Sequence, residues 1–322
     1  MTQRYISSLA PMITGFLEYK HSLGYKYGSG AYYLYELDRY CHENGYGGQL
    51  TKELVEGWIL AKESRNPSPY RSWISPIREF GKYLQSFGYP DAYIVSDQFT
   101  IRKYHPMPYL FTEDEIEIFF KTCDSIVLEK HHQGRHLVIP VFFRFMYSCG
   151  VRTKEARLLR VKDVYLDASY VDIIGSKGHR DRRLYLQEDL KQLLSRYESE
   201  IAVFFPEREY FFPSTTGTCY SASGIGRNFN LIWDAAGLRK GCRKQPRSYS
   251  FRHHFAFANI NRWATEGKNV NAMLPYLMRY MGHSSLEGTY YYIHLVPDFF
   301  PNYTEMTLAL EDVLPEVSRD EE

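Results

Sequence analysis

The chain has 322 residues, of which 44% are hydrophobic and 24% are charged, and its formal net charge is +1. This length suits two domains of unequal size, and no apolar run reaches the roughly 18 residues of a membrane-spanning helix, which argues against a membrane protein. Five scattered cysteines without Cys-x-x-Cys spacing argue against a disulfide framework and a zinc site. Because no signal-peptide core follows Met1, we expect a cytoplasmic protein.

The charged residues are unevenly distributed along the chain. The last twelve residues, Glu311 to Glu322, hold six acids and one base, and there is no acid between Asp234 and Glu266. Basic residues concentrate in that acid-free stretch and again beside Asp181. The residues expected to contact a polyanionic partner are Arg180, Arg182, Arg239, Lys240, Arg243, Lys244 and Arg247. This pattern predicts contacts with double-stranded DNA, although solvated charged loops would produce it too.

The first hundred residues predict a helical domain. Apolar residues recur there at helical spacing, and Thr51 is a candidate N-terminal cap. The expected helices cover residues 13–23, 31–41, 51–61 and 70–87. Pro106 and Pro108 lie close together and stop helices on both sides. We therefore divide the chain into a helical domain, 1–104, and a second domain, 105–322.

The second domain is predicted to begin with helices. Thr112 and Glu115 have the spacing of a capping box, in which each residue satisfies a backbone N–H of the other. A strongly apolar helix is expected over residues 138–149, and Gly150 suits the turn that ends it.

A β-hairpin follows in the predicted order of elements. Residues 170–174 and 183–186 have strand-like composition and flank a turn that contains Lys177 and Gly178. From Ser221 onward the pattern is helical again, with breaks at Gly237, Gly267 and Gly282. The expected fold class is therefore mainly α with a small β-sheet.

Four short motifs in this domain carry residues suited to catalysis. They are Gly150-Val151-Arg152-Thr153-Lys154-Glu155, Gly175-Ser176-Lys177-Gly178, Tyr249-Ser250-Phe251-Arg252-His253, and Met281-Gly282-His283 followed by Tyr290-Tyr291-Tyr292. Their order and spacing resemble the catalytic domain of tyrosine recombinases of the phage integrase type. That family has a Gly-x-Arg-x-x-Glu box, a hairpin lysine, a His-x-x-Arg-His box, and a Gly-His box with a tyrosine nine residues later. The resemblance covers about residues 112–297, and residues 1–104 resemble the family's helical core-binding domain more weakly.

The resemblance implies a site that binds the phosphate of a DNA strand. Arg152 and Arg252 would neutralise that phosphate, since a guanidinium is always charged and pairs bidentately with phosphate oxygens. His283 would donate a hydrogen bond to the same phosphate. It lies at the expected start of a helix, where anions bind favourably.

The resemblance also implies covalent catalysis. Tyr292 would attack the phosphate and form a 3′-phosphotyrosyl bond, which stores the energy of the broken strand so that rejoining needs no ATP. The neighbouring Tyr291 is the alternative nucleophile. Lys177 would protonate the 5′ hydroxyl leaving group as general acid.

One residue departs from the family pattern. Tyr249 stands where the family has the first histidine of the His-x-x-Arg box. Tyrosine normally titrates near 10, so it can donate a hydrogen bond to a phosphate but is a poor base at neutral pH. His253 keeps its family position, in a scaffold or a catalytic role, and Glu155 would orient Arg152 or cap its helix.

No metal or cofactor is predicted. His131, His132 and His136 lack cysteine or carboxylate companions at ligand spacing. By resemblance the partner is double-stranded DNA, bound by a homotetramer on two sites, and the sequence leaves open whether accessory proteins take part. The apolar segment after Tyr292 would join the protomers, although it could also pack on its own domain.

Two rival functions stay open at this point. The first is a catalytically silent DNA-binding or architectural protein of the same fold, which Tyr249 favours. The second is a related topoisomerase that relaxes supercoils without exchanging strands between partners. Neither the target DNA sequence nor the choice among integration, excision, transposition and resolution follows from these motifs.

Overall fold

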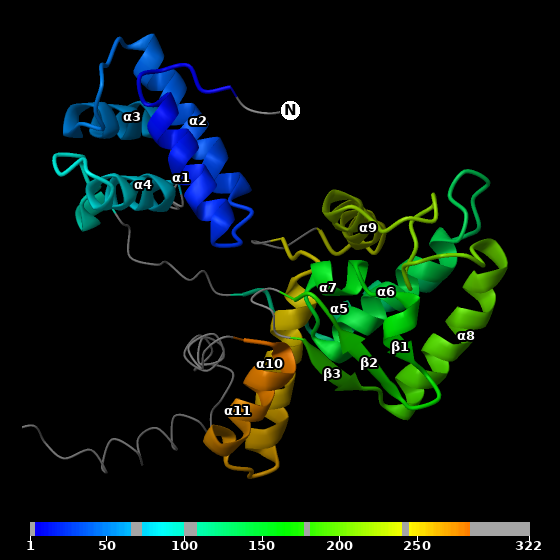
Figure 1. Ribbon diagram of the computed structural model, residues 1–322. Coiled ribbons are helices and arrows are strands. Elements are labelled where there is room, and N and C mark those ends of the chain that lie inside the picture. The colour runs from blue at the N-terminus through cyan, green and yellow to red at the C-terminus, as the bar shows by residue number, and fades with distance from the viewer. Residues whose placement is uncertain (1–3, 66–72, 100–107, 177–180, 240–244, 284–322) are drawn as a thin grey trace, which may run out of the picture. The chain divides into compact units, whose positions relative to one another are not determined.

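The chain divides into two compact units, Met1–Pro106 and Met107–Glu322. The structure is a computed structural model, shown in Figure 1, and it describes residues 4–65, 73–99, 108–176, 181–239 and 245–283. No helix among these described residues is long and apolar enough to cross a membrane.

The first unit is a small helical bundle. Its described helices are α1 (Ala10–Ser22), α2 (Gly28–Glu43), α3 (Lys52–Arg65), α4 (Ile74–Ser86) and the short 3-10 helix η1 (Asp97–Phe99). All four expected helices are present, and the Thr51 hydroxyl accepts a hydrogen bond from the Leu54 N–H at 3.3 Å, as expected of a cap. The start of the fourth expected helix lies outside the described residues, which contain it from Ile74.

The second unit is mainly helical and contains one small sheet, as predicted. Its described elements are α5 (Glu113–Asp124), α6 (Arg135–Cys149), α7 (Thr153–Arg157), η2 (Val161–Asp163), β1 (Val164–Tyr165), β2 (Tyr170–Ile173), β3 (Arg182–Tyr185), α8 (Glu188–Phe204), α9 (Ala222–Ala235), α10 (Ser250–Thr265) and α11 (Val270–Met281). The strands are antiparallel in the order β1-β2-β3.

Local signals in the sequence are confirmed where the structure describes them. The Glu115 N–H donates to the Thr112 hydroxyl at 3.2 Å and the Thr112 N–H donates to the Glu115 carboxylate at 2.9 Å, which is the predicted capping box. Gly150 ends α6 with a φ of 57°. The strand β1, the helix α8 and the short 3-10 helices η1 and η2 were not predicted, although apolar residues of α8 recur at helical spacing at Leu190 and Leu194.

The core of the second unit surrounds α6. This helix packs against α5, α7, α8 and α10, and most of its side chains from Val138 to Cys149 are buried. Phe251, in the first turn of α10, stacks on Phe111 with a 4.9 Å centroid separation and is fully buried. The ends of α6 and α10 are therefore held rigidly beside each other.

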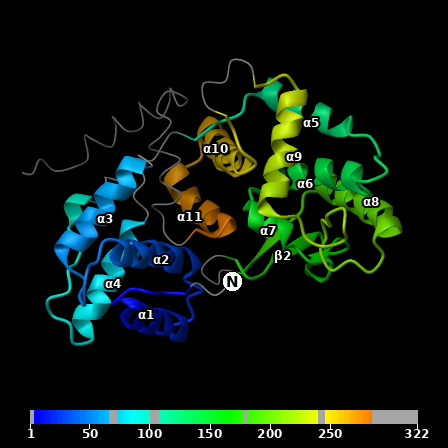
Figure 2. The same cartoon turned by 90° about the horizontal axis from the view of Figure 1, so that it is seen from above.

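The helices α10 and α11 form an antiparallel pair with its own apolar cluster. Figures 1 and 2 both show α11 beside α10, and residues such as Ile260 and Leu274 are buried between them. The chain turns at Gly267 with a φ of 68° and leaves α11 at Gly282 with a φ of 67°, as the predicted breaks require. The C-terminal end of α11 thus comes back to the start of α10.

Candidate active site

Arg252 is fully buried and joins the ends of three helices. It lies in the first turn of α10, and its two terminal nitrogens donate to the carbonyls of Gly150 at 2.8 Å and Met281 at 2.7 Å. Gly150 ends α6 and Met281 is the last residue of α11. Carbonyls at helix C-termini carry partial negative charge, which offsets the cost of burying the guanidinium.

Arg152 begins α7 and reaches the same end of α11. Its Nη1 donates to Glu155 Oε1 at 2.7 Å, and its Nη2 donates to the Gly282 carbonyl at 2.8 Å. The Arg152 backbone N–H donates to Glu155 Oε2 at 2.9 Å, so Glu155 both caps the helix and orients the guanidinium. Both roles considered for Glu155 in the sequence are therefore present in the structure.

A third arginine, Arg182, completes this cluster. Its Nη2 and Nη1 donate to the two Glu155 oxygens at 2.8 and 3.2 Å, and its Nε donates to the Tyr280 carbonyl at 2.6 Å. Its side chain is only 8% exposed. The sequence analysis assigned Arg182 to DNA, and that assignment stays a prediction; in the structure its guanidinium binds Glu155 and the Tyr280 carbonyl.

The C-terminal turn of α11 thus offers three successive carbonyls to three arginines. The carbonyl of Tyr280 accepts from Arg182, that of Met281 from Arg252, and that of Gly282 from Arg152. These are among the last carbonyls of the helix, which have no acceptor role within it. The helix end therefore assembles residues that are far apart in the sequence into one positively charged site.

Glu155 is ionised at the centre of the cluster. Burial alone would raise its pKa, but the hydrogen bonds and positive charge of Arg182, together with the hydrogen bonds from Arg152, lower the pKa to about 2. Its side chain is 4% exposed, so solvent screens these interactions little. The carboxylate therefore keeps its charge at every pH at which the protein would function.

We expect the ionisation of Glu155 to appear as pH-dependent stability. The folded-state pKa of about 2 lies below the ordinary value of 4.5, so the stabilisation is complete above pH 4.5 and is lost as the pH falls towards 2. A shift of this size corresponds to roughly 3 kcal/mol. Urea unfolding of the wild type and Glu155→Gln at several pH values measures it. Parallel stability curves for the two proteins would contradict the expectation.

His283 lies directly after Gly282 and faces the same cluster. Burial lowers its pKa, and the positive charges of Arg252, Arg152 and Arg182 lower it further, to about 3. The imidazole is therefore neutral at pH 7 and can donate one hydrogen bond. Gly282 permits this close approach, since a Cβ at its positive φ would lie 3.0 Å from the nearest Arg182 nitrogen.

Tyr249 and His253 lie together at the start of α10. Their ring centroids are 5.0 Å apart in an edge-to-face arrangement, and Tyr249 is 40% exposed. Tyr249 occupies the N-cap position of α10, three residues before Arg252, so its phenol and the buried guanidinium leave the same helical turn. The replacement of the family histidine by Tyr249 thus places an accessible phenol in this turn.

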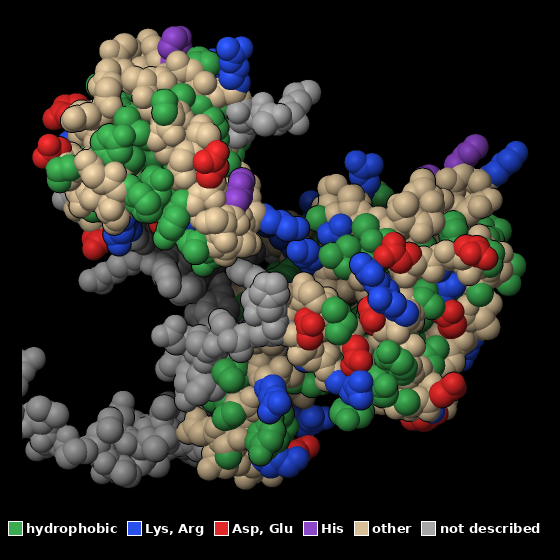
Figure 3. All heavy atoms as spheres, viewed as in Figure 1, with side chains coloured by type: hydrophobic (Ala, Val, Ile, Leu, Met, Phe, Trp, Pro, Cys, Tyr) green, Lys and Arg blue, Asp and Glu red, His purple; other side chains and the backbone are tan. Residues whose placement is uncertain are grey.

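Several predicted residues lie outside the described part of the chain: Lys177, Arg180, Lys240, Arg243, Lys244, Tyr291 and Tyr292. Of the remaining basic candidates, Arg247 is exposed, while Arg239 forms a bidentate ion pair with Asp234. Figure 3 shows Lys and Arg interspersed with Asp and Glu on the visible face of the second unit. Arg239 is thus partly neutralised, and Arg247 is better suited to an anionic partner.

The histidines considered for a metal do not gather with other ligands. In the described ranges no group of three or more His, Cys, Asp or Glu side chains could hold a metal ion. His132 instead lies 2.7 Å from the Glu129 carboxylate on an exposed turn.

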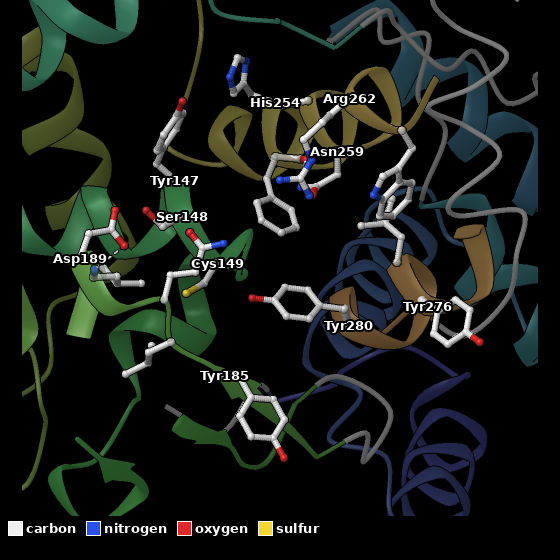
Figure 4. Close-up of a pocket in the computed structure, with 17 residues that line it drawn as sticks. Tyr147, Ser148, Cys149, Tyr185, Asp189, His254, Asn259, Arg262, Tyr276 and Tyr280 are labelled. Carbon is white, nitrogen blue, oxygen red and sulfur yellow. Dashed lines mark hydrogen bonds between the residues drawn. The ribbon is translucent and has the colours of Figure 1, made fainter. Parts of the chain in front are cut away.

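A pocket of about 720 Å³ is lined by residues of α6, α8, α10 and α11. Figure 4 shows Tyr280 pointing from α11 towards Cys149 at the end of α6, and Tyr276 farther out along the same helix. Burial raises the pKa of the Cys149 thiol to about 12, so this thiol is unreactive. Tyr280 belongs to both features, because its ring lines the pocket while its carbonyl accepts from Arg182.

Comparison with known proteins relates this site to a described family. The model of the phage integrase family matches residues 110–298. "Putative integrase/recombinase y4rE" of Sinorhizobium fredii is 26% identical over 288 residues, which cover 88% of this chain and 91% of that protein. Tyrosine recombinase XerC of Staphylococcus saprophyticus is 25% identical over 246 residues, which cover 74% of each protein.

Solved structures show the same fold at lower identity. XerH site-specific recombinase bound to a palindromic difH substrate, in a post-cleavage complex, matches with a TM-score of 0.65 and 17% identity over 88% of this chain and 78% of that one. A lambda integrase dimer bound to a COC′ core site matches with a TM-score of 0.63 and 14% identity, covering 88% and 94%.

Proposed function

The chain belongs to the phage integrase family, and on this premise we propose that it is a site-specific recombinase that cleaves and rejoins double-stranded DNA. The strands would be joined to Tyr292 through a 3′-phosphotyrosyl bond. The observation that carries the proposal is the convergence of Arg152, Arg252 and His283 at the end of α11. We assign to this site the scissile phosphate of one DNA strand.

Arg152 and Arg252 stabilise the phosphate as it becomes five-coordinate. Each guanidinium has five N–H donors in a fixed fork, so it can hold helix carbonyls and still donate to a phosphate oxygen. Charge placed in advance in this way is usually the largest catalytic effect. Neutral His283 donates a further hydrogen bond, and a bound phosphate raises its pKa again by opposing the arginine charges.

The bond changes involve two residues outside the described part of the chain. The Tyr292 oxygen forms the new bond to phosphorus while the bond from phosphorus to the 5′ oxygen breaks. Lys177, on the β2–β3 hairpin, gives its proton to that leaving oxygen. The phenol proton of Tyr292 must leave as well, and Tyr249 is a weak base for this purpose.

The proposed partners follow from the family. Residues 1–104 would bind DNA together with Arg247, Arg180, Lys240, Arg243 and Lys244, through contacts to phosphates that position the duplex.

Four protomers would act on two DNA sites in the cytoplasm, for integration, excision or transposition of a mobile element. The apolar segment after Tyr292 would join the protomers. Analytical ultracentrifugation of the DNA complex tests the assembly, and one duplex bound by two protomers would contradict it.

Covalent trapping tests the proposed reaction. Wild type, Tyr292→Phe and Tyr291→Phe are incubated with a nicked duplex that carries the ends of the DNA element encoding the chain, and adducts are resolved on a denaturing gel. The nick lets the cleaved end diffuse away, so the covalent intermediate accumulates. We expect an adduct in the wild type and in Tyr291→Phe and none in Tyr292→Phe.

The other outcomes identify the rival functions. An adduct lost only in Tyr291→Phe would move the nucleophile by one residue. Tight, salt-sensitive DNA binding without any adduct would support the silent DNA-binding protein. Relaxation of supercoiled plasmid of unrelated sequence would support the topoisomerase.

A further inference from the structure

Arg182 connects three elements of the candidate site. It belongs to none of the four sequence motifs that resemble the family. It is the first residue of β3, it binds Glu155 of α7, and it binds the Tyr280 carbonyl of α11. We propose that Arg182 is a positioning residue that holds Arg152 and the end of α11 in place for the phosphate. This inference rests on the proposed recombinase function.

The orientation of the Glu155 carboxylate depends on Arg182. Oε1 accepts from Nη1 of both arginines, at 2.7 Å from Arg152 and 3.2 Å from Arg182. Oε2 accepts from the Arg152 backbone N–H at 2.9 Å and from Arg182 Nη2 at 2.8 Å. The fork of Arg182 therefore fixes the plane of the carboxylate, and that plane sets the direction of the Arg152 guanidinium.

Burial makes this arrangement hard to replace. The side chains of Glu155 and Arg182 are 4% and 8% exposed, while that of Arg152 is 20% exposed. Breaking a buried pair by removing one partner is costly, because the remaining charge loses its compensation. Without Arg182, the buried carboxylate would have only Arg152 to bind, and it would draw that guanidinium away from the phosphate.

Arg182 also anchors the hairpin that carries the proposed general acid. It pairs with Ile173 in the sheet register and lies five residues after Lys177. Its bond to the Tyr280 carbonyl ties the base of this hairpin to α11. One side chain thus contacts Glu155, which binds Arg152, and the end of α11, while it forms the first residue of β3.

The direct test measures the mobility of Arg152 without DNA. Nitrogen-15 spectra of the arginine side chains are recorded for the wild type, Arg182→Met, Arg182→Lys and the control Arg183→Gln, with Arg152→Lys used for assignment. Arg183 is the matched neighbour on β3, and it forms an equally bidentate but exposed pair with Asp172 at 2.9 Å. We expect restrained Arg152 Nη signals in the wild type and Arg183→Gln, and averaged signals in Arg182→Met. Unchanged Arg152 signals in Arg182→Met would overturn the proposal, whether or not the chain cleaves DNA.

Adduct formation supplies the functional test. At saturating nicked duplex, Arg182→Met should react about 10- to 100-fold more slowly, by analogy with the partners that orient metal ligands, while its dissociation constant for the DNA stays unchanged. Arg182→Lys should be intermediate, because one ammonium cannot bind both carboxylate oxygens and the carbonyl. The double variant Arg182→Met with Glu155→Gln should be no slower than the slower single variant.

Two outcomes would contradict positioning through Glu155. One is full activity in Arg182→Lys, and the other is a rate loss in the double variant equal to the combined losses of the two single variants. Absence of any adduct in the wild type would refute the recombinase function alone.

Discussion

Replacing Arg252 by lysine is expected to slow adduct formation by roughly 100- to 1000-fold, the loss that follows removal of one preorganised donor. The fork of Arg252 donates to the Gly150 carbonyl at 2.8 Å and to the Met281 carbonyl at 2.7 Å, and a single ammonium cannot hold both and also meet a phosphate. The measurement is the rate of adduct formation at saturating nicked duplex.

A matched control separates this role from the general effect of an arginine-to-lysine change. Arg144 forms a bidentate pair with the exposed Asp124, at 2.8 and 2.7 Å, away from the cluster. Arg144→Lys should therefore react at the wild-type rate, because a surface ion pair contributes little. Equal rates for Arg252→Lys and Arg144→Lys would show that the buried guanidinium does not act on the phosphate.

Features that depend on neighbours in the sequence could be predicted. The capping box of Thr112 and Glu115, the hairpin of β2 and β3, and the helix break at Gly282 each follow from a few adjacent residues. The motifs around Arg152 and Arg252 could be assigned because their spacing matches a family. All of these signals lie within single elements or turns.

Features that depend on tertiary packing could not be predicted in the same way. Nothing in the sequence shows that carbonyls of α11 bind arginines from β3, α7 and α10. One signal for Arg182 was present, however. Strand residues alternate between two faces, so Arg182 shares a face with the fully buried Leu184, and a charged residue at such a position requires a buried partner.

The end of α11 also links the site to the rest of the unit. Tyr280 contacts Cys149 through its ring hydroxyl and Arg182 through its carbonyl, so the packing of α11 against α6 and the placement of the arginines are set together. A change that shifts this turn would move three cations at once. Because a misplacement of about 1 Å can cost roughly 100-fold in rate, the proposed reaction would require this turn to be rigid.

Tyr249→His is the second substitution with a large expected effect, and it should increase activity. A histidine at the start of α10 can accept a proton near neutral pH, whereas a neutral phenol is a poor proton acceptor. If proton removal from Tyr292 limits cleavage, the variant should form adduct about 10- to 100-fold faster, at or below the usual contribution of a general base.

The pH profile identifies the cause of any change in rate. An imidazole must be neutral to accept a proton, so the rate of Tyr249→His should rise through the pKa of the new imidazole and then level off. Tyr185→His, at a 72% exposed position on β3, is the control and should keep the wild-type profile. A lower rate in Tyr249→His would mean instead that the phenol itself serves the reaction, by donating to the phosphate, and that this chain has exchanged a base for a donor.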